Sequence, residues 1–96
     1  YDMGMAQGFE WDEDKSAANL ADRGIDFAFA RRIFADPDRL TVPDTRQDYG
    51  EDRFLTVGHV EGRMFVAVWT KRGNRIRIIS VRKANERERG RYGKDN

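Results

Sequence analysis

Two apolar, β-branched runs that follow each other closely constrain the fold of this chain more than any other feature. They span residues 54–60 and 64–70, and the segment 61–63 between them contains a glycine and suits a tight hairpin turn. A second turn with glycine and asparagine, residues 72–74, is followed by a third run over residues 75–81. The three runs predict an antiparallel β-meander.

The third run is apolar on both sides at its far end. Strict alternation places Ile76 and Ile78 on one side and Ile79 and Val81 on the other. A strand that is apolar on both faces is typical of the centre of a sheet.

Capping signals predict two helices before the meander and one after it. Asp12 can cap a first helix that runs to about Asp22, and Gly24 supplies a left-handed stop. Asp26 can cap a second helix, whose apolar residues recur at helical spacing and belong to the core. Residues 84–92 are charged and end before a glycine, which indicates a short C-terminal helix.

Short strands over residues 9–11 and 40–42 complete the order β, α, α, β, β, β, β, α. Helices and strands grouped in this way favour an α+β fold, with a small antiparallel sheet, two N-terminal helices and a short C-terminal helix on one face. The 96 residues suffice for one domain, which we expect to span residues 9–96. Residues 1–8 are expected to be a flexible tail or an added segment.

Composition excludes several kinds of site. The chain has no cysteine and one histidine, so it has no disulfide framework and no thiolate zinc site, and little to bind a metal by imidazole. Neither GxGxxG nor a Walker loop is present, so no nucleotide cofactor is expected. No run approaches the roughly 18 apolar residues of a membrane span. We therefore expect a cytoplasmic protein without metal, cofactor or membrane partner.

The net charge of +1 conceals a strong asymmetry along the chain. Residues 1–70 hold 8 Lys and Arg against 14 Asp and Glu, a net charge of −6, whereas residues 71–96 hold 10 against 3, a net charge of +7. Such a concentration of positive charge indicates a polyanion site, and its arginines have the planar fork that suits phosphate. A solvated, salt-bridged terminal helix is the simpler alternative.

Several motifs in order resemble the BrnT toxin family. The first is the segment 9–15, with Asn19 and Gly24 after it. The others are the segments 50–54, 70–73 and 75–84, with Gly58 between the first two and Glu88-Arg89 followed by Tyr92 at the end. At Arg23 the family usually has a histidine. The resemblance implies a RelE-like fold and a ribonuclease toxin of a type II toxin–antitoxin pair. It also implies neutralisation by a BrnA-like antitoxin, with DNA bound only through the antitoxin complex.

The residues themselves are compatible with metal-independent cleavage of RNA, which would inhibit translation and growth. In this reaction the ribose 2′-OH attacks its own phosphate and leaves a 2′,3′-cyclic phosphate. It requires a base, cationic stabilisation of the phosphorane and a proton donor for the leaving oxygen.

Arginines of the third strand are the candidates for the cationic role. An arginine between isoleucines, such as Arg77, must either pair with a buried carboxylate or face an open phosphate site. We favour the phosphate site, because no acidic residue lies in that strand. The cationic candidates for catalysis are Arg53, Arg72, Arg77, Arg82 and Lys83, and those for RNA binding are Lys71, Arg75 and Arg89.

Glu51 is the candidate general base, because it lies on the same side of an extended segment as Arg53. A solvated ion pair is its simpler interpretation. His59 ranks behind Glu51. Tyr92 is a candidate for base stacking or proton donation, and it could equally hold the last helix on the sheet. Trp69 could stack on an unpaired base, or it could be a core or interface residue.

Two other functions would use the same basic residues, on one face of the sheet. A module that binds nucleic acid without cutting it would use the same arginines to hold the backbone, and its affinity would fall steeply with salt. A module that binds a partner protein would present this face to an acidic or amphipathic helix.

Overall fold

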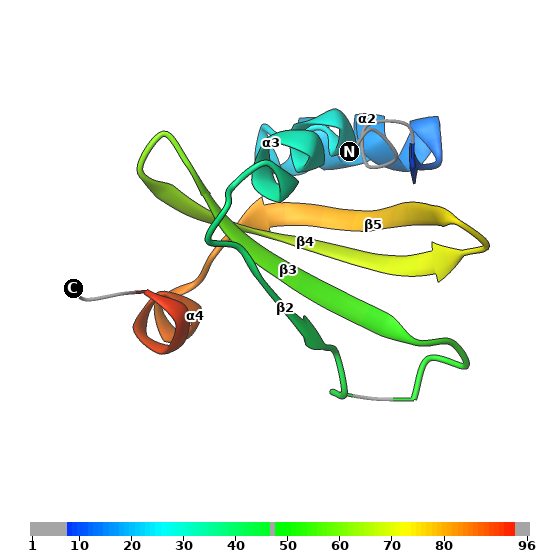
Figure 1. The fold of residues 1–96 in the computed structure, drawn as a ribbon. Helices are drawn as coiled ribbons and strands as arrows, with labels where there is room; N and C mark the ends of the chain where they lie inside the picture. Colours follow the sequence, from blue (N-terminus) through cyan, green and yellow to red (C-terminus); the bar gives the residue numbers. More distant parts are fainter. Residues whose placement is uncertain (1–7, 47, 94–96) are drawn as a thin grey trace.

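The computed structural model describes residues 8–46 and 48–93. Within these residues, five strands form one sheet in the order β1-β5-β4-β3-β2 (Figure 1). Strands β2 (Leu40–Pro43), β3 (Arg53–Val60), β4 (Arg63–Arg72) and β5 (Arg75–Lys83) pair antiparallel, as the meander predicted. Residues 1–7, the bulk of the predicted tail, lie outside the described residues.

The sheet is mixed, so the prediction of a wholly antiparallel sheet is wrong. Strand β1 (Phe9–Glu10) pairs with β5 in parallel, with Phe9 opposite Ile76 and Glu10 opposite Arg77. The carbonyl of Gly8 also accepts a hydrogen bond of 2.6 Å from the Ile76 amide. A two-residue strand has too few side chains for its pattern to reveal its direction, which is set by the helices that follow it over the sheet.

The β3–β4 hairpin forms where it was predicted, with a turn one residue shorter than the segment 61–63. Its ladder runs from Arg53 opposite Thr70 to Val60 opposite Arg63. Glu61 and Gly62 form the turn with φ of 51° and 81°, the left-handed pair that a two-residue hairpin turn requires.

A β-bulge interrupts the pairing of β4 with β5. Val68 lies opposite Ser80 and Trp69 lies opposite Ile78, so Ile79 is an extra residue on β5. Val81 therefore joins Ile78 in the core under the N-terminal helices, and Ile79 packs on the other face. This corrects the predicted alternation, which assigned Ile79 and Val81 to one side.

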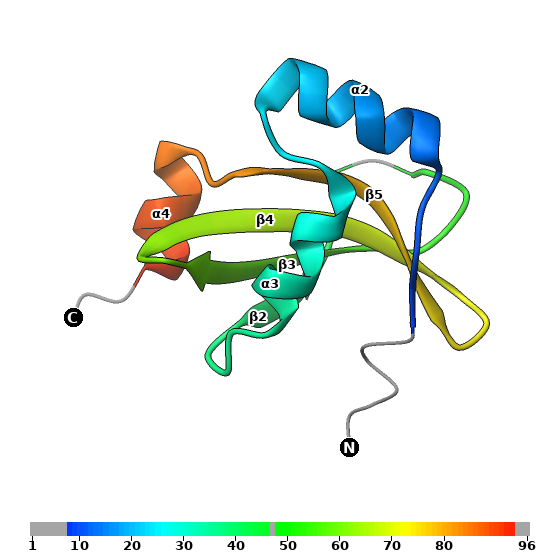
Figure 2. The same ribbon diagram turned by 90° about the horizontal axis from the view of Figure 1, so that it is seen from above.

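Helices α2 (Glu13–Arg23) and α3 (Ala30–Phe34) cover one face of the sheet (Figures 1 and 2). Asp12 caps α2, and Gly24 ends it with φ of 77°. Asp26 caps a 3₁₀ turn, η1 (Phe27–Phe29), which continues into α3, so the predicted second helix begins more tightly wound than an α-helix. The amide of Asn19 donates to the carbonyls of Ile25 and Val81 and ties α2 to β5.

Helix α4 (Glu86–Tyr92) lies on the opposite face from α2 and α3 (Figure 1). Asn85 caps it in a reciprocal capping box with Glu88. Tyr92 packs against a second core cluster, which includes Val57 and Val66. The prediction that all helices cover one face is therefore wrong, because both faces of the sheet are apolar enough to hold a helix.

Two glycines give a matched test of this packing. An added Cβ at Gly58 would lie 2.7 Å from the carbonyl oxygen of Ile33, whereas at Gly90, inside α4, it would meet nothing within 4 Å. We expect Gly58→Ala to lower the free energy of unfolding by about 1–3 kcal/mol through overpacking. Gly90→Ala should raise it by about 0.5–1 kcal/mol, because glycine is a poor helix former. Urea unfolding of both variants measures the two shifts, and equal shifts would contradict the close approach at Gly58.

Candidate functional site

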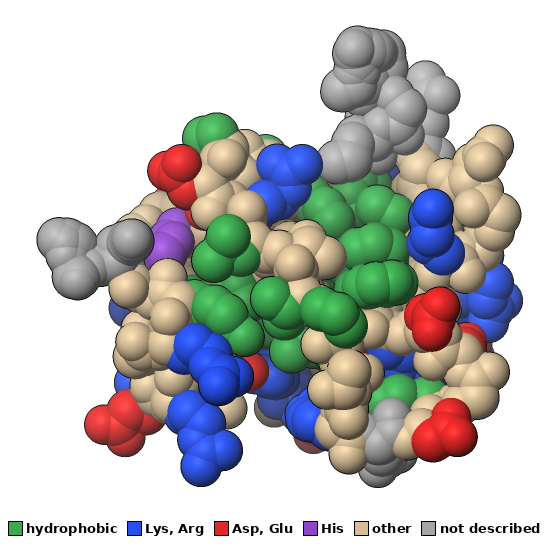
Figure 3. All heavy atoms as spheres, turned by 60° about the horizontal axis from the view of Figure 1, so that its bottom comes forward, with side chains coloured by type: hydrophobic (Ala, Val, Ile, Leu, Met, Phe, Trp, Pro, Cys, Tyr) green, Lys and Arg blue, Asp and Glu red, His purple; other side chains and the backbone are tan. Residues whose placement is uncertain are grey.

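The sheet face opposite α2 and α3, here called the open face, carries basic residues on two sides of an apolar middle. Arg77 lies opposite Thr70 and Arg82 lies opposite Val66, and both partners project from the same side of β4. Leu55 and Ile79 lie in the apolar middle and are half-buried. Figure 3 shows hydrophobic side chains gathered across this view, with lysine and arginine side chains around them.

Glu10 pairs with both arginines at the outer end of the open face. Its carboxylate accepts a hydrogen bond of 2.9 Å from Arg75 and one of 3.1 Å from Arg77. The hydrogen bond from Arg77, more than any other contact, holds the pKa of Glu10 below its usual value. The acidic partner absent from the strand itself thus comes from β1, and the premise that favoured an open phosphate site at Arg77 fails.

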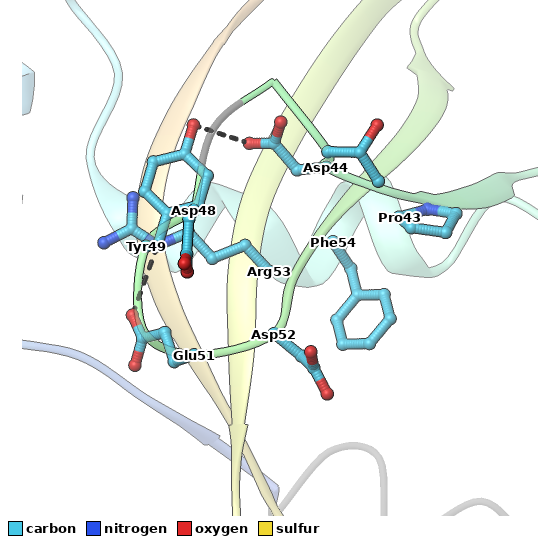
Figure 4. A pocket seen from close by; sticks show the side chains of 9 residues that line it. Pro43, Asp44, Asp48, Tyr49, Glu51, Asp52, Arg53 and Phe54 are labelled. Carbon is cyan, nitrogen blue, oxygen red and sulfur yellow. Dashed lines mark hydrogen bonds and ion pairs between the residues drawn. The ribbon is translucent and has the colours of Figure 1, made fainter.

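Arg53 lies in the same row across the sheet but faces a different hollow. Its Nε is 3.2 Å from a carboxylate oxygen of Glu51, and its guanidinium lies 4.0 Å from the centre of the Tyr49 ring. These side chains line a loop hollow of about 610 Å³, bounded by residues 43–45, 48–49 and 51–54 (Figure 4). The predicted pairing of Glu51 with Arg53 is therefore formed.

Asp44 fixes the loop that separates this hollow from the next. Its side chain is fully buried and accepts hydrogen bonds of 2.8 Å from both Nε and Nη2 of Arg46 and one of 3.3 Å from the Tyr49 hydroxyl. Arg46 lowers the pKa of Asp44, and Asp44 raises the pKa of Arg46. The sequence holds only a local signal for a turn here, an aspartate just after the proline of an edge strand, and no signal for this ion pair.

Arg82 and Glu88 form the tightest ion pair near α4. Nη1 and Nη2 of Arg82 donate to the two carboxylate oxygens at 2.7 and 2.8 Å. The two side chains are only 17% and 14% exposed. Glu88 also accepts a hydrogen bond from the Asn85 amide, and the hydrogen bonds from Arg82 hold the pKa of Glu88 below its usual 4.5.

Arg82 and Tyr92 meet in a hollow between α4, β2 and β3, here called the α4 cleft. It has a volume of about 330 Å³. Arg46, Arg87 and Arg91 line it as well, and its two carboxylates, Asp44 and Glu88, are both already held by arginines. In the part of the chain that the structure describes, no ion pair involves Arg87 or Arg91. The cleft therefore offers net positive charge to an anion.

The other predicted residues lie outside the α4 cleft. Lys83 and Arg89 line a separate hollow on the other side of α4, together with His59. Lys71 and Arg72 are exposed at the end of β4, near Arg75.

Trp69 does not lie on the open face. It is buried under α3, where its indole N–H donates a 2.8 Å hydrogen bond to Thr56 and its ring packs edge-on against Phe34. This position corresponds to the core alternative of the sequence analysis and gives no platform for an RNA base.

A small α+β domain with an arginine-lined cleft beside its last helix suits the binding of a phosphate-bearing polyanion. A family model described as the ribonuclease toxin, BrnT, of a type II toxin–antitoxin system matches residues 11–88, and the chain belongs to this family. The resemblance stated from the motifs is thereby confirmed. Membership indicates a ribonuclease, with RNA as substrate and an antitoxin as partner.

No curated protein sequence matches the chain. Among the described residues, no helix is long and apolar enough to cross a membrane. The same residues contain no group of three His, Cys, Asp or Glu side chains that could hold a metal ion.

The Arg82–Glu88 pair predicts a pH-dependent stability. Because the folded pKa of Glu88 is lowered, its contribution is present above pH 4.5 and is lost as the pH falls through the folded pKa. We expect Glu88→Gln to lower the free energy of unfolding by about 2 kcal/mol at neutral pH. The amide keeps one oxygen that can accept from Arg82 but loses the negative charge and the second acceptor. Urea unfolding should show the gap to wild type closing below pH 4.5. Glu86→Gln, an exposed change in the same turn, is the control, and a gap independent of pH would contradict the assignment.

Proposed function

We propose that this chain is a metal-independent endoribonuclease toxin whose active centre is the α4 cleft. The observation that carries the proposal is the excess of arginines over carboxylates around a hollow that Tyr92 also lines. Arginines there supply the positive charge that a phosphorane requires. Cutting messenger RNA in the cytoplasm would inhibit translation and growth.

The reaction has one covalent step, and its atoms balance without a protein nucleophile. The ribose 2′-OH attacks the adjacent phosphorus and gives up its proton to a base. The bond from phosphorus to the 5′-oxygen breaks, and that oxygen takes a proton from a donor. The products are a 2′,3′-cyclic phosphate and a 5′-OH.

Arg82, Arg87 and Arg91 are the proposed phosphate ligands. Among the described residues, Arg82 keeps its Nε–H and one hydrogen of Nη2 for a phosphate oxygen, because Glu88 and the Lys83 carbonyl use the other three donors. Glu88 positions Arg82 and is unsuited to act as the base, because its lowered pKa makes it a weak acceptor of protons. Arg53 would bind a flanking phosphate, whereas Arg77 is already held by Glu10.

Glu51 remains the proposed base and Tyr92 the proposed proton donor. The loop hollow that Glu51 lines shares residues 43–45 with the α4 cleft, and in this proposal the ribose-phosphate unit lies at that boundary. Tyr92 stands on the last turn of α4, with its ring against the second core cluster. Packing of the ring holds the hydroxyl in place.

The antitoxin, in this proposal, resembles BrnA and neutralises the toxin by covering the open face. An acidic, amphipathic segment would match the apolar middle, where Leu40 is 49% exposed, and the arginines around it. DNA would be bound only by the complex, through the antitoxin.

Cleavage in the presence of a chelator tests the proposal directly. We expect the purified chain, free of antitoxin, to fragment single-stranded RNA in excess EDTA, because arginines replace a metal in stabilising the transition state. Mass spectrometry of the fragments should show 2′,3′-cyclic phosphate and 5′-OH ends. RNA that is bound but stays intact would favour the non-cutting binding module, and 5′-phosphate ends would exclude attack by the 2′-OH.

Removal of one hydroxyl tests the proton donor. We expect Tyr92→Phe to lower kcat by about 10²-fold or more, in the range of general acid catalysis. The phenyl ring keeps the packing, and only the hydroxyl that donates the proton is lost. Tyr49→Phe removes a hydroxyl from the neighbouring hollow and should lower kcat only slightly. Single-turnover cleavage of a short RNA measures both, and a normal rate for Tyr92→Phe would exclude the role. Arg82→Ala is a poorer probe, because it would also strip Glu88 of its partner and loosen α4.

A further inference from the structure

A second group of basic side chains lies outside the α4 cleft, on the other side of α4. A hollow of about 490 Å³ opens there between the β3–β4 turn and the helix, here called the hairpin hollow. Arg63, Lys83 and Arg89 line it together with His59, and none of its described lining residues is acidic. A phosphate is the common biological anion that such a group recognises.

The arginines of α4 project from different sides of the helix, toward either this hollow or the α4 cleft. Arg87 and Arg91 are four residues apart and share one side of the helix, whereas Arg89 lies two residues from each and points away from them. Nη1 of Arg89 donates a 2.9 Å hydrogen bond to the Ala84 carbonyl, which fixes the direction of its guanidinium. The helix thus presents arginines to the hollows on both of its sides.

A third hollow joins the two around the C-terminal end of α4. It has a volume of about 760 Å³, and it shares Arg91 and Tyr92 with the α4 cleft and His59 and Gly93 with the hairpin hollow. Two aspartates also line it. The carboxylate of Asp36 accepts hydrogen bonds from the amides of His59 and Asp38, which leaves it only 11% exposed. Asp38 is exposed.

We propose that the hairpin hollow is a second phosphate subsite, which binds the backbone of an RNA strand several nucleotides away from the cleaved bond. The strand would pass around the end of α4 from the cleft to Arg63, Lys83 and Arg89. A helix with its side chains is about 10 Å across, so the ligand is an oligonucleotide and not a dinucleotide. This inference rests on the proposed function, because it takes RNA as the ligand.

Arg63 is the residue to change, because it is exposed and belongs to no other part of the proposed machinery. Arg63→Glu reverses one charge in the hairpin hollow, and Lys15→Glu makes the same change in net charge on exposed α2 as the control. The probe is a 12-nucleotide 2′-O-methyl RNA, which cannot be cleaved, and a dinucleotide of the same chemistry. Fluorescence anisotropy at several salt concentrations measures the affinities.

We expect Arg63→Glu to weaken binding of the 12-mer about tenfold and to reduce the salt slope by about 0.7, the value for one phosphate contact on a single strand. Binding of the dinucleotide should not change, and Lys15→Glu should bind both probes as wild type does. If the two variants lose equal affinity for the 12-mer, the loss is explained by net charge alone, and the subsite is overturned. An equal loss on the dinucleotide would also overturn it, because the hollow would then belong to the central site.

Two additions keep the result interpretable. If Arg63→Glu unfolds, as judged by circular dichroism, Arg63→Gln replaces it, with an expected loss of about threefold and the same criteria. Cleavage of unmodified RNA is measured separately. A chain that binds the 12-mer through Arg63 but cuts no RNA would refute the proposed function and leave the subsite standing.

Discussion

A bidentate ion pair between Arg82 of β5 and Glu88 of α4 holds a seven-residue helix against a sheet face that is otherwise open. A helix of this length is not stable by itself in water, so its position depends on this pair, on its capping box and on the packing of Tyr92. The hollows around α4 exist because the helix stands there. The contact that fixes the Arg82 side chain therefore also builds the walls of the α4 cleft.

The parts of the fold that local rules determine were predictable. The hairpin turn at Glu61 and Gly62, the caps at Asp12 and Asp26 and the ends of the long strands all follow from nearby residues. The direction of β1 and the face chosen by α4 were not predictable, because both are decided by contacts between segments far apart in the chain. The Glu10–Arg77 contact, which joins residues 67 positions apart, is the clearest case.

The candidate site also has parts that the sequence predicts and parts that depend on contacts between distant segments. Arg82 and Tyr92 were expected and share a cleft, because they lie close in sequence on elements that the chain must bring together. Charge counting along the chain overstated the site at Arg75 and Arg77, since the acidic first part of the chain folds back and supplies Glu10. The charge count also gave no indication that Arg87 and Arg91 would form no ion pair with any described residue. Only the fold shows which charges are neutralised.

The bulge at Ile79 has a consequence for where the arginines of β5 project. In a regular strand, residues five apart project from opposite faces, and Arg77 and Arg82 are five apart. The one extra residue between them restores the match, so both side chains stand over the open face. The length of this strand is therefore as strictly constrained as its composition. A chain one residue shorter at this point would turn Arg82 and the helix it holds toward the face that α2 and α3 already fill, and two layers would compete for one surface.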